Sequence, residues 1–323
     1  MRTPLSLALV VVVLSSVASA FSINPADDYL ALWLDASVSG SVVTGVISGG
    51  MSYDAATFAS GGGAAGDGQP VAWWRDLRTP GAGNLAGSHK NSLYYTANAF
   101  PVGPVSKCPT YVANAFRGHP ALRLDGTDDG LVTWDGAMPV LTPDHTIIVV
   151  GRSSVSVNGT NGAYFSYGRY WGSETTVELA IYKDASGQHF RMREPSVDTF
   201  GSTATPLLSS VDMLVQRRGF NGTNYTDNGF IGKSATSPWL TATDSGTFST
   251  ATPGFRIGQH TSAGQYLTGD IMELIVYNRA LSNTEIADLQ MTLYAKWSIP
   301  EPATLALLGL AALPALRRRG RRG

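Results

Sequence analysis

The chain of 323 residues has a single cysteine, Cys108. One thiol cannot form an intrachain disulfide, which excludes a cystine-stapled scaffold and leaves the core to stabilise the fold. Charged residues make up only 15% of the chain and show no heptad pattern, which argues against a coiled coil. No Gly-x-Ser-x-Gly elbow is present, and the histidines lack metal-site spacing. They are His89, His119, His145, His189 and His260.

Glycine and short apolar runs are plentiful instead. There are 36 glycines, and Thr, Ser, Val and Tyr are abundant. Several segments alternate polar and apolar residues at period two or form short apolar runs, a pattern typical of strands joined by tight turns. The predicted strands are 29–35, 121–125, 131–134, 146–151, 163–167, 177–182, 190–193, 213–217, 255–257 and 271–277. Their number predicts an all-β protein with two packed antiparallel sheets.

The first 20 residues are typical of a secretory signal peptide. Arg2 supplies the positive region, residues 5–14 are apolar, and small residues precede a cleavage point after Ala20. A buried first strand or a membrane anchor is the alternative, but the apolar run is shorter than the ~20 residues that span a bilayer. We therefore predict export and a mature chain beginning at Phe21.

The C-terminus predicts a second targeting segment, 299–323. Pro300, Glu301 and Pro302 precede an apolar stretch at 305–316 and five terminal arginines. A core helix is the alternative, but the stretch is apolar all round and contains a glycine and a proline. Such a stretch can enter the bilayer while the arginines stay cytoplasmic.

These C-terminal features closely resemble the PEP-CTERM sorting signal of Gram-negative bacteria. The resemblance implies that an exosortase-type transpeptidase cuts near the Pro-Glu-Pro box. The preceding domain would then pass to the cell envelope surface or the extracellular matrix. Membrane contact is expected only through this segment, before processing.

Residues 21–298 are expected to form one domain, interrupted by a Gly/Ser-rich stretch at 39–68 that is either a binding loop or a passive insertion. Without the two targeting segments the chain keeps 17 basic and 23 acidic side chains, which gives a net charge of about −6. A nucleic-acid partner is not expected, because phosphate binding needs a basic face.

One helix is expected near the end of the domain. Ser282 and Glu285 form a capping box, with Leu281 at a staple position. The apolar residues on one helical face are Ile286, Leu289, Leu293 and Trp297. This face should pack against a sheet.

Four segments carry a family resemblance: Leu-Trp-Leu-Asp-Ala at 32–36, Trp-Arg-Asp at 74–76, the stretch 118–126, and 269–282 with its Tyr-Asn-Arg-Ala-Leu-Ser end. Together they resemble the LamG-like jelly-roll family of bacterial surface proteins. The resemblance implies a concanavalin A-like sandwich with one short C-terminal helix, besides hydrophobic targeting helices at both ends. It indicates a fold rather than an activity, since jelly rolls host lectins, hydrolases, adhesins and spacers.

Catalysis is not expected. Related laminarinase-like glycosidases carry Glu-x-Asp-x-x-Glu on one strand, as nucleophile and acid. The nearest match here is Asp270 to Glu273, with threonine at the leading position 268. Residues three apart lie on opposite faces of a regular strand, so the sequence predicts no paired-carboxylate site.

Calcium is the one cofactor that the sequence suggests. Asp125, Asp128 and Asp129 concentrate three carboxylates in a Gly-containing turn, and Ca²⁺ favours such oxygen clusters. Related LamG domains sometimes hold Ca²⁺ at the sandwich rim. A plain β-turn is the alternative, since Asp and Gly are common turn formers.

Glycan contacts are expected from aromatic side chains, whose faces stack on sugar rings. Arg169, Tyr170 and Trp171 share a Gly-bounded loop, and Trp73 is a second candidate, whereas Trp74 is expected to pack inward. Core packing is the alternative for each. The leading hypothesis is a non-catalytic adhesion or carbohydrate-binding module for extracellular polysaccharide. The rivals are a structural matrix protein without a ligand and a polysaccharide-degrading enzyme.

Overall fold

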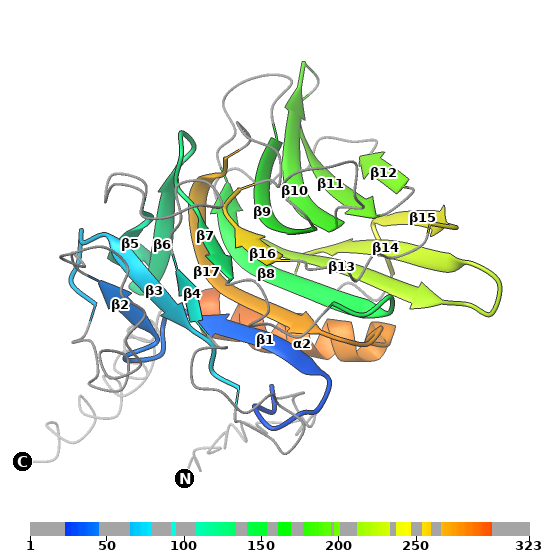
Figure 1. The fold of residues 1–323 in the computed structure, drawn as a ribbon, viewed down its shortest axis with the longest axis horizontal. Coiled ribbons are helices and arrows are strands. Elements are labelled where there is room, and N and C mark those ends of the chain that lie inside the picture. Colours follow the sequence, from blue (N-terminus) through cyan, green and yellow to red (C-terminus); the bar gives the residue numbers. More distant parts are fainter. Residues whose placement is uncertain are drawn as a thin grey trace, which may run out of the picture.

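The computed structural model describes residues 23–44, 65–78, 92–94, 108–133, 141–153, 161–168, 177–185, 187–194, 197–200, 212–232, 237–246, 254–259 and 266–298. These residues form two antiparallel sheets and helix α2 (Asn283–Ser298) (Figure 1). Both predicted targeting segments lie outside the described residues, with Ala20, Pro300, Glu301 and Pro302. Within the described part of the chain, no helix combines the length and the hydropathy needed to cross a bilayer.

The eight-stranded sheet has the order β15-β14-β13-β8-β17-β6-β5, and β1 also pairs with β17. Its strands are β1 (Leu30–Asp35), β5 (Thr110–Phe116), β6 (His119–Asp125), β8 (His145–Ser153), β13 (Asp212–Phe220), β14 (Tyr225–Ile231), β15 (Leu240–Asp244) and β17 (Thr268–Tyr277).

The nine-stranded sheet has the order β12-β11-β10-β9-β16-β7-β4-β3-β2. Its strands are β2 (Val42–Thr44), β3 (Val71–Arg75), β4 (Ser92–Tyr94), β7 (Leu131–Thr133), β9 (Asn161–Gly168), β10 (Val177–Asp184), β11 (Gly187–Glu194), β12 (Val197–Phe200) and β16 (Gly254–Ile257). Strand β2 lies inside the predicted 39–68 insertion, so the sheet begins within that stretch; residues 45–64 lie outside the described ranges.

The main hydrophobic core lies between the two sheets. It joins residues of the eight-stranded sheet, such as Val149 and Leu214, to residues of the nine-stranded sheet, such as Trp74, Leu179 and Phe190. Side chains alternate across a strand, so one face of each sheet supplies this core. The predicted two-sheet antiparallel sandwich is confirmed, and each of the ten predicted segments overlaps a strand.

Helix α2 covers the outer face of the eight-stranded sheet. Its buried residues Ile286, Leu289, Leu293 and Trp297 pack in a second core with Ile148 and Val215, as the helical pattern predicts. Figure 1 shows the helix beside β1 and β17 on this side of the sandwich. The outer face of the nine-stranded sheet is therefore the face that α2 leaves uncovered.

The helix begins with the predicted capping box. The backbone N–H of Glu285 donates to Ser282 Oγ at 3.2 Å, and the backbone N–H of Ser282 donates to Glu285 Oε2 at 2.8 Å. Arg279 Nη2 also donates to Glu285 Oε1 at 2.8 Å. This hydrogen bond is the main cause that lowers the pKa of Glu285 to about 2.

Ser282→Ala should destabilise the fold by about 1 kcal/mol in urea, because it removes the acceptor of the capping hydrogen bond.

Glu285 adds a pH dependence to the stability of the fold. Its folded pKa lies below its unfolded pKa of about 4.5, so its contribution is present above that pH and is lost as the pH falls towards 2. Between pH 4.5 and pH 2, the melting temperature of Glu285→Gln should fall less than that of the wild type. An equal fall in the two proteins would contradict the prediction.

Candidate functional site

A lateral row of residues crosses the nine-stranded sheet. Residues directly opposite one another in antiparallel strands occupy the same face of the sheet. The register joins opposite residues from β3 to β12 without a break. We call them the outer row: Trp73, Tyr94, Val132, Arg256, Ser166, Glu178, Arg193 and Asp198.

The outer row faces away from the sandwich core. Its sequence neighbours Trp74, Phe165, Leu179 and Ile257 are buried between the sheets. Alternation along each strand places the row on the opposite face, the one that α2 does not cover. The prediction that Trp74 packs inward is confirmed.

The central part of this face is polar and buried. Glu178 and Ser166 have no exposed surface, and Arg256 and Arg191 are less than a tenth exposed. Arg191 Nη1 lies 3.4 Å from Glu178 Oε2, and Ser166 Oγ donates to the carbonyl of Gln259 at 3.0 Å. Because burying charged groups is costly without a functional or structural partner, such a concentration on a non-core face marks a candidate site.

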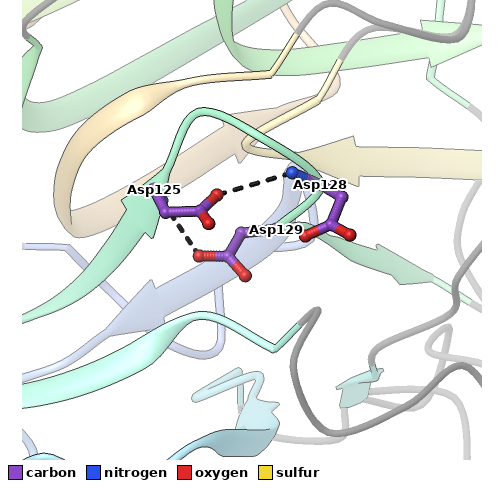
Figure 2. A group of neighbouring side chains, drawn as sticks. All are labelled: Asp125, Asp128 and Asp129. Carbon is purple, nitrogen blue, oxygen red and sulfur yellow. Dashed lines mark hydrogen bonds between the residues drawn. The ribbon is translucent and has the colours of Figure 1, made fainter.

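The predicted calcium-site residues Asp125, Asp128 and Asp129 do come together (Figure 2). Their carboxylates offer oxygens that lie within 4.8 Å of one another. Asp129 Oδ2 accepts from the backbone N–H of Asp125 at 2.9 Å, and Asp125 Oδ1 accepts from the N–H of Thr127 at 2.7 Å. Burial raises the pKa of Asp129 to about 7, and the neighbouring carboxylates add to the rise.

This aspartate turn lies at the edge of the outer row. It connects β6 to β7, and hence one sheet to the other. Gly130 follows directly, and a Cβ there would come 2.8 Å from Cδ of Gln259, so the turn lies close against the Gln259 side chain. The carbonyl of Gln259 in turn accepts from Ser166 in the outer row.

Calcium binding at the aspartate turn stays a prediction. Ca²⁺ at about ten times its dissociation constant should stabilise the chain by ~1.4 kcal/mol and raise the melting temperature by about 3 °C. Chelation should reverse the rise, and Asp128→Ala should abolish it, whereas the exposed Asp28→Ala should keep it. An unchanged melt of the wild type in millimolar Ca²⁺ would end the hypothesis.

The predicted glycan-binding residues divide into two groups. The backbone of Trp73 takes a place in the outer row, opposite Tyr94. Arg169, Tyr170 and Trp171 lie outside the described residues. Sequence reasoning missed the polar centre of the row; the signal was present in β9, β10 and β16, where polar residues alternate with apolar ones.

The prediction that Asp270 and Glu273 lie on opposite faces is wrong. A β-bulge between Ile271 and Glu273 shifts the alternation, so that Asp270 opposite Arg152 and Glu273 opposite Val150 share the helix-side face. Asp270 accepts from Arg152 and, at 2.7 Å, from Arg123.

Glu273 is fixed by donors of its own. It accepts from Trp33 Nε1 at 2.8 Å, Trp297 Nε1 at 2.7 Å and Lys296 Nζ at 2.8 Å. Burial raises its pKa, as does the charge of Asp35. These contacts tie α2 to β1 and β17, which is a structural role.

The sequence matches no protein-family model and no curated protein. Among solved structures, the chain is similar to a GH54 α-L-arabinofuranosidase soaked with a cyclic sulfate inhibitor, with 11% identity and a TM-score of 0.56 over 85% of this chain and 66% of that chain. Domain 4 of AbnA, a GH43 extracellular arabinanase from Geobacillus stearothermophilus, in complex with arabinotriose, is 15% identical, with a TM-score of 0.42 over 56% of this chain and 81% of that chain. The Ruminococcus gnavus IT-sialidase CBM40 is 14% identical, with a TM-score of 0.40 over 53% of this chain and 96% of that chain. At these identities the similarity shows a β-sandwich fold alone.

Proposed function

We propose that this chain is a non-catalytic carbohydrate-binding module of the LamG-like jelly-roll type, which binds a polysaccharide along the outer row. The observation that carries the proposal is the row itself. Aromatic positions at Trp73 and Tyr94 lead to Arg256, which keeps a small exposed surface beside the fully buried Ser166 and Glu178, on the face that α2 does not cover. Aromatic rings suit the apolar face of a sugar, and charged planar groups suit its hydroxyls.

The dimensions of the row suit an extended ligand. Neighbouring strands lie about 4.8 Å apart, so the eight strands of the row extend over roughly 34 Å. That length accommodates several sugar rings laid across the strands. A polysaccharide strand is therefore a better match than a single monosaccharide.

Binding without cleavage is favoured by the residue between Glu178 and Asp198 in the outer row. Glu178 and Asp198 occupy the row two strands apart, roughly 10 Å between backbones, which keeps a polysaccharide-degrading enzyme as the rival function. Inverting glycosidases leave room for a water between their two carboxylates. Here Arg193 occupies the register position between them, and Arg191 lies 3.4 Å from Glu178.

Export to the cell surface or the extracellular matrix belongs to the same proposal. It is supported by the signal-like residues 1–20 and by the PEP-CTERM-like segment 299–323. An exosortase-type enzyme is the processing partner. Mass spectrometry of the exported chain should find Phe21 as its first residue and a C-terminus near Pro300.

A polysaccharide array probed with residues 21–298 tests the function. The proposal expects retention of at least one envelope or matrix polysaccharide and no release of reducing sugar over a long incubation. Release of reducing sugar would establish the enzyme instead. No retention by any polysaccharide would leave the structural matrix protein.

A further inference from the structure

A second polar cluster lies inside the sandwich, at the end where β11 faces β8, β13, β14 and β15. All its side chains are buried. We call it the inter-sheet cluster: His145, Glu194, Gln216, Arg218, Asp227 and Asp244. It is separate from the outer row and from the aspartate turn.

The strand register builds this cluster. Arg218 lies opposite His145 on one side and Asp227 on the other, so the three residues form a row on the inner face of the eight-stranded sheet. Glu194 reaches this row from the other sheet. Its Oε1 lies 3.0 Å from His145 Nε2 and accepts from Gln216 Nε2 at 2.7 Å.

Several oxygens of the cluster have no hydrogen-bond donor. Neither oxygen of Asp227 accepts a hydrogen bond, although Arg218 Nε lies 3.5 Å from Oδ1. Glu194 Oε2 and Gln216 Oε1 also lack a donor. Buried acceptors without donors are rare and point to a group that the protein itself does not supply.

The charges of the inter-sheet cluster indicate that the missing group is positively charged. Glu194, Asp227 and Asp244 offer oxygens within 4.8 Å of one another, and Arg218 supplies one positive charge, with Nη2 2.8 Å from Asp244 Oδ2. Two further positive charges are needed to neutralise three ionised carboxylates in a dry interior. Two bound protons or one divalent cation would supply them.

His145 lies beside these carboxylates. Its Nδ1 lies 2.9 Å from the carbonyl of Thr142, so this nitrogen carries a proton. Its Nε2 lies 3.0 Å from Glu194 Oε1, where a protonated Nε2 donates to the carboxylate and an unprotonated Nε2 turns its lone pair towards a bound cation. A histidine that donates its other ring N–H to a backbone carbonyl is the usual arrangement of metal ligands.

We propose that the inter-sheet cluster is a binding site for one divalent transition-metal ion, held by Glu194, Asp227 and Asp244, whose oxygens lie within 4.8 Å of one another. Carboxylate ligands suit Mn²⁺, and the imidazole of His145, 3.0 Å from Glu194 Oε1, would add a nitrogen ligand that suits Zn²⁺. The ion would join β14 and β15 of one sheet to β11 of the other.

The full chain tests this site after unfolding in chelator and refolding with ZnCl₂ or MnCl₂ at pH 8. Elemental analysis should find one metal per chain after desalting, with a higher melting temperature than in the chelated chain. Asp227→Asn keeps the shape of the side chain and should lower the affinity by about tenfold or more. Asp270→Asn, another buried carboxylate, should lower stability and keep the metal.

The variant Asp128→Ala distinguishes metal bound in the inter-sheet cluster from metal bound at the aspartate turn, because it should leave the inter-sheet metal in place. Retention of metal by wild type but equally by Asp227→Asn would overturn the assignment of the site. A refolded wild-type chain that retains no metal would overturn the proposal.

Discussion

Replacing Arg218 by methionine should lower the free energy of unfolding of the chelated chain by about 3–5 kcal/mol, the usual effect of removing one partner from a buried ion network. The Arg218 side chain has no exposed surface and lies within 4 Å of the carboxylates of Glu194, Asp227 and Asp244. Burial, followed by the charge of Glu194, already raises the pKa of Asp227 to about 8, while Arg218 opposes the rise. Urea denaturation monitored by circular dichroism measures the loss.

Arg152→Met is the matched control. Arg152 is 31% exposed, and its partner Asp270 keeps a second cation in Arg123, so a loss of about 1 kcal/mol or less is expected. Equal losses in the two variants would show that the inter-sheet cluster is no more important to stability than a partly exposed ion pair.

Replacing Arg256 by glutamine should weaken polysaccharide binding by about tenfold or more, because a hydrogen bond from a charged donor contributes ~1.5–3 kcal/mol. Arg256 lies in the middle of the outer row, opposite Ser166 on one side and Val132 on the other. Trp73→Ala, at the far aromatic end, should weaken binding further through the lost stacking surface. Isothermal titration with a polysaccharide retained on the array measures both.

Arg117→Gln controls for the loss of a positive charge. Arg117 is exposed and follows β5 in the other sheet, so its replacement should leave the affinity unchanged. If Arg117→Gln weakened binding as much as Arg256→Gln, general charge rather than the outer row would be attracting the ligand.

The elements that the sequence predicted well are those whose signals are local. The capping box of Ser282 and Glu285 spans four residues, and both of its hydrogen bonds are present. The strand β14 was missed, because its polar residues Asp227 and Asn228 resemble turn formers by composition. Asp227 lies opposite Arg218 in the strand register, and its side chain enters a cluster built from both sheets.

The candidate sites also divide into those with a local sequence signal and those that depend on strand register. Asp125 and Asp129 lie four residues apart, so their meeting in one turn was visible in the sequence. The outer row joins residues as distant as Trp73 and Arg256, and only strand register brings them together. The shared face of Asp270 and Glu273 depends on a single bulge, which strand alternation cannot predict.

Hydrogen exchange of residues 21–298 with and without a bound polysaccharide tests the central claim most directly. We expect added protection in β9, β10, β11 and β16, the strands at the centre of the outer row, and little change in α2. Protection concentrated on α2 and β17, with none on those four strands, would place the ligand on the opposite face of the sandwich and contradict the account.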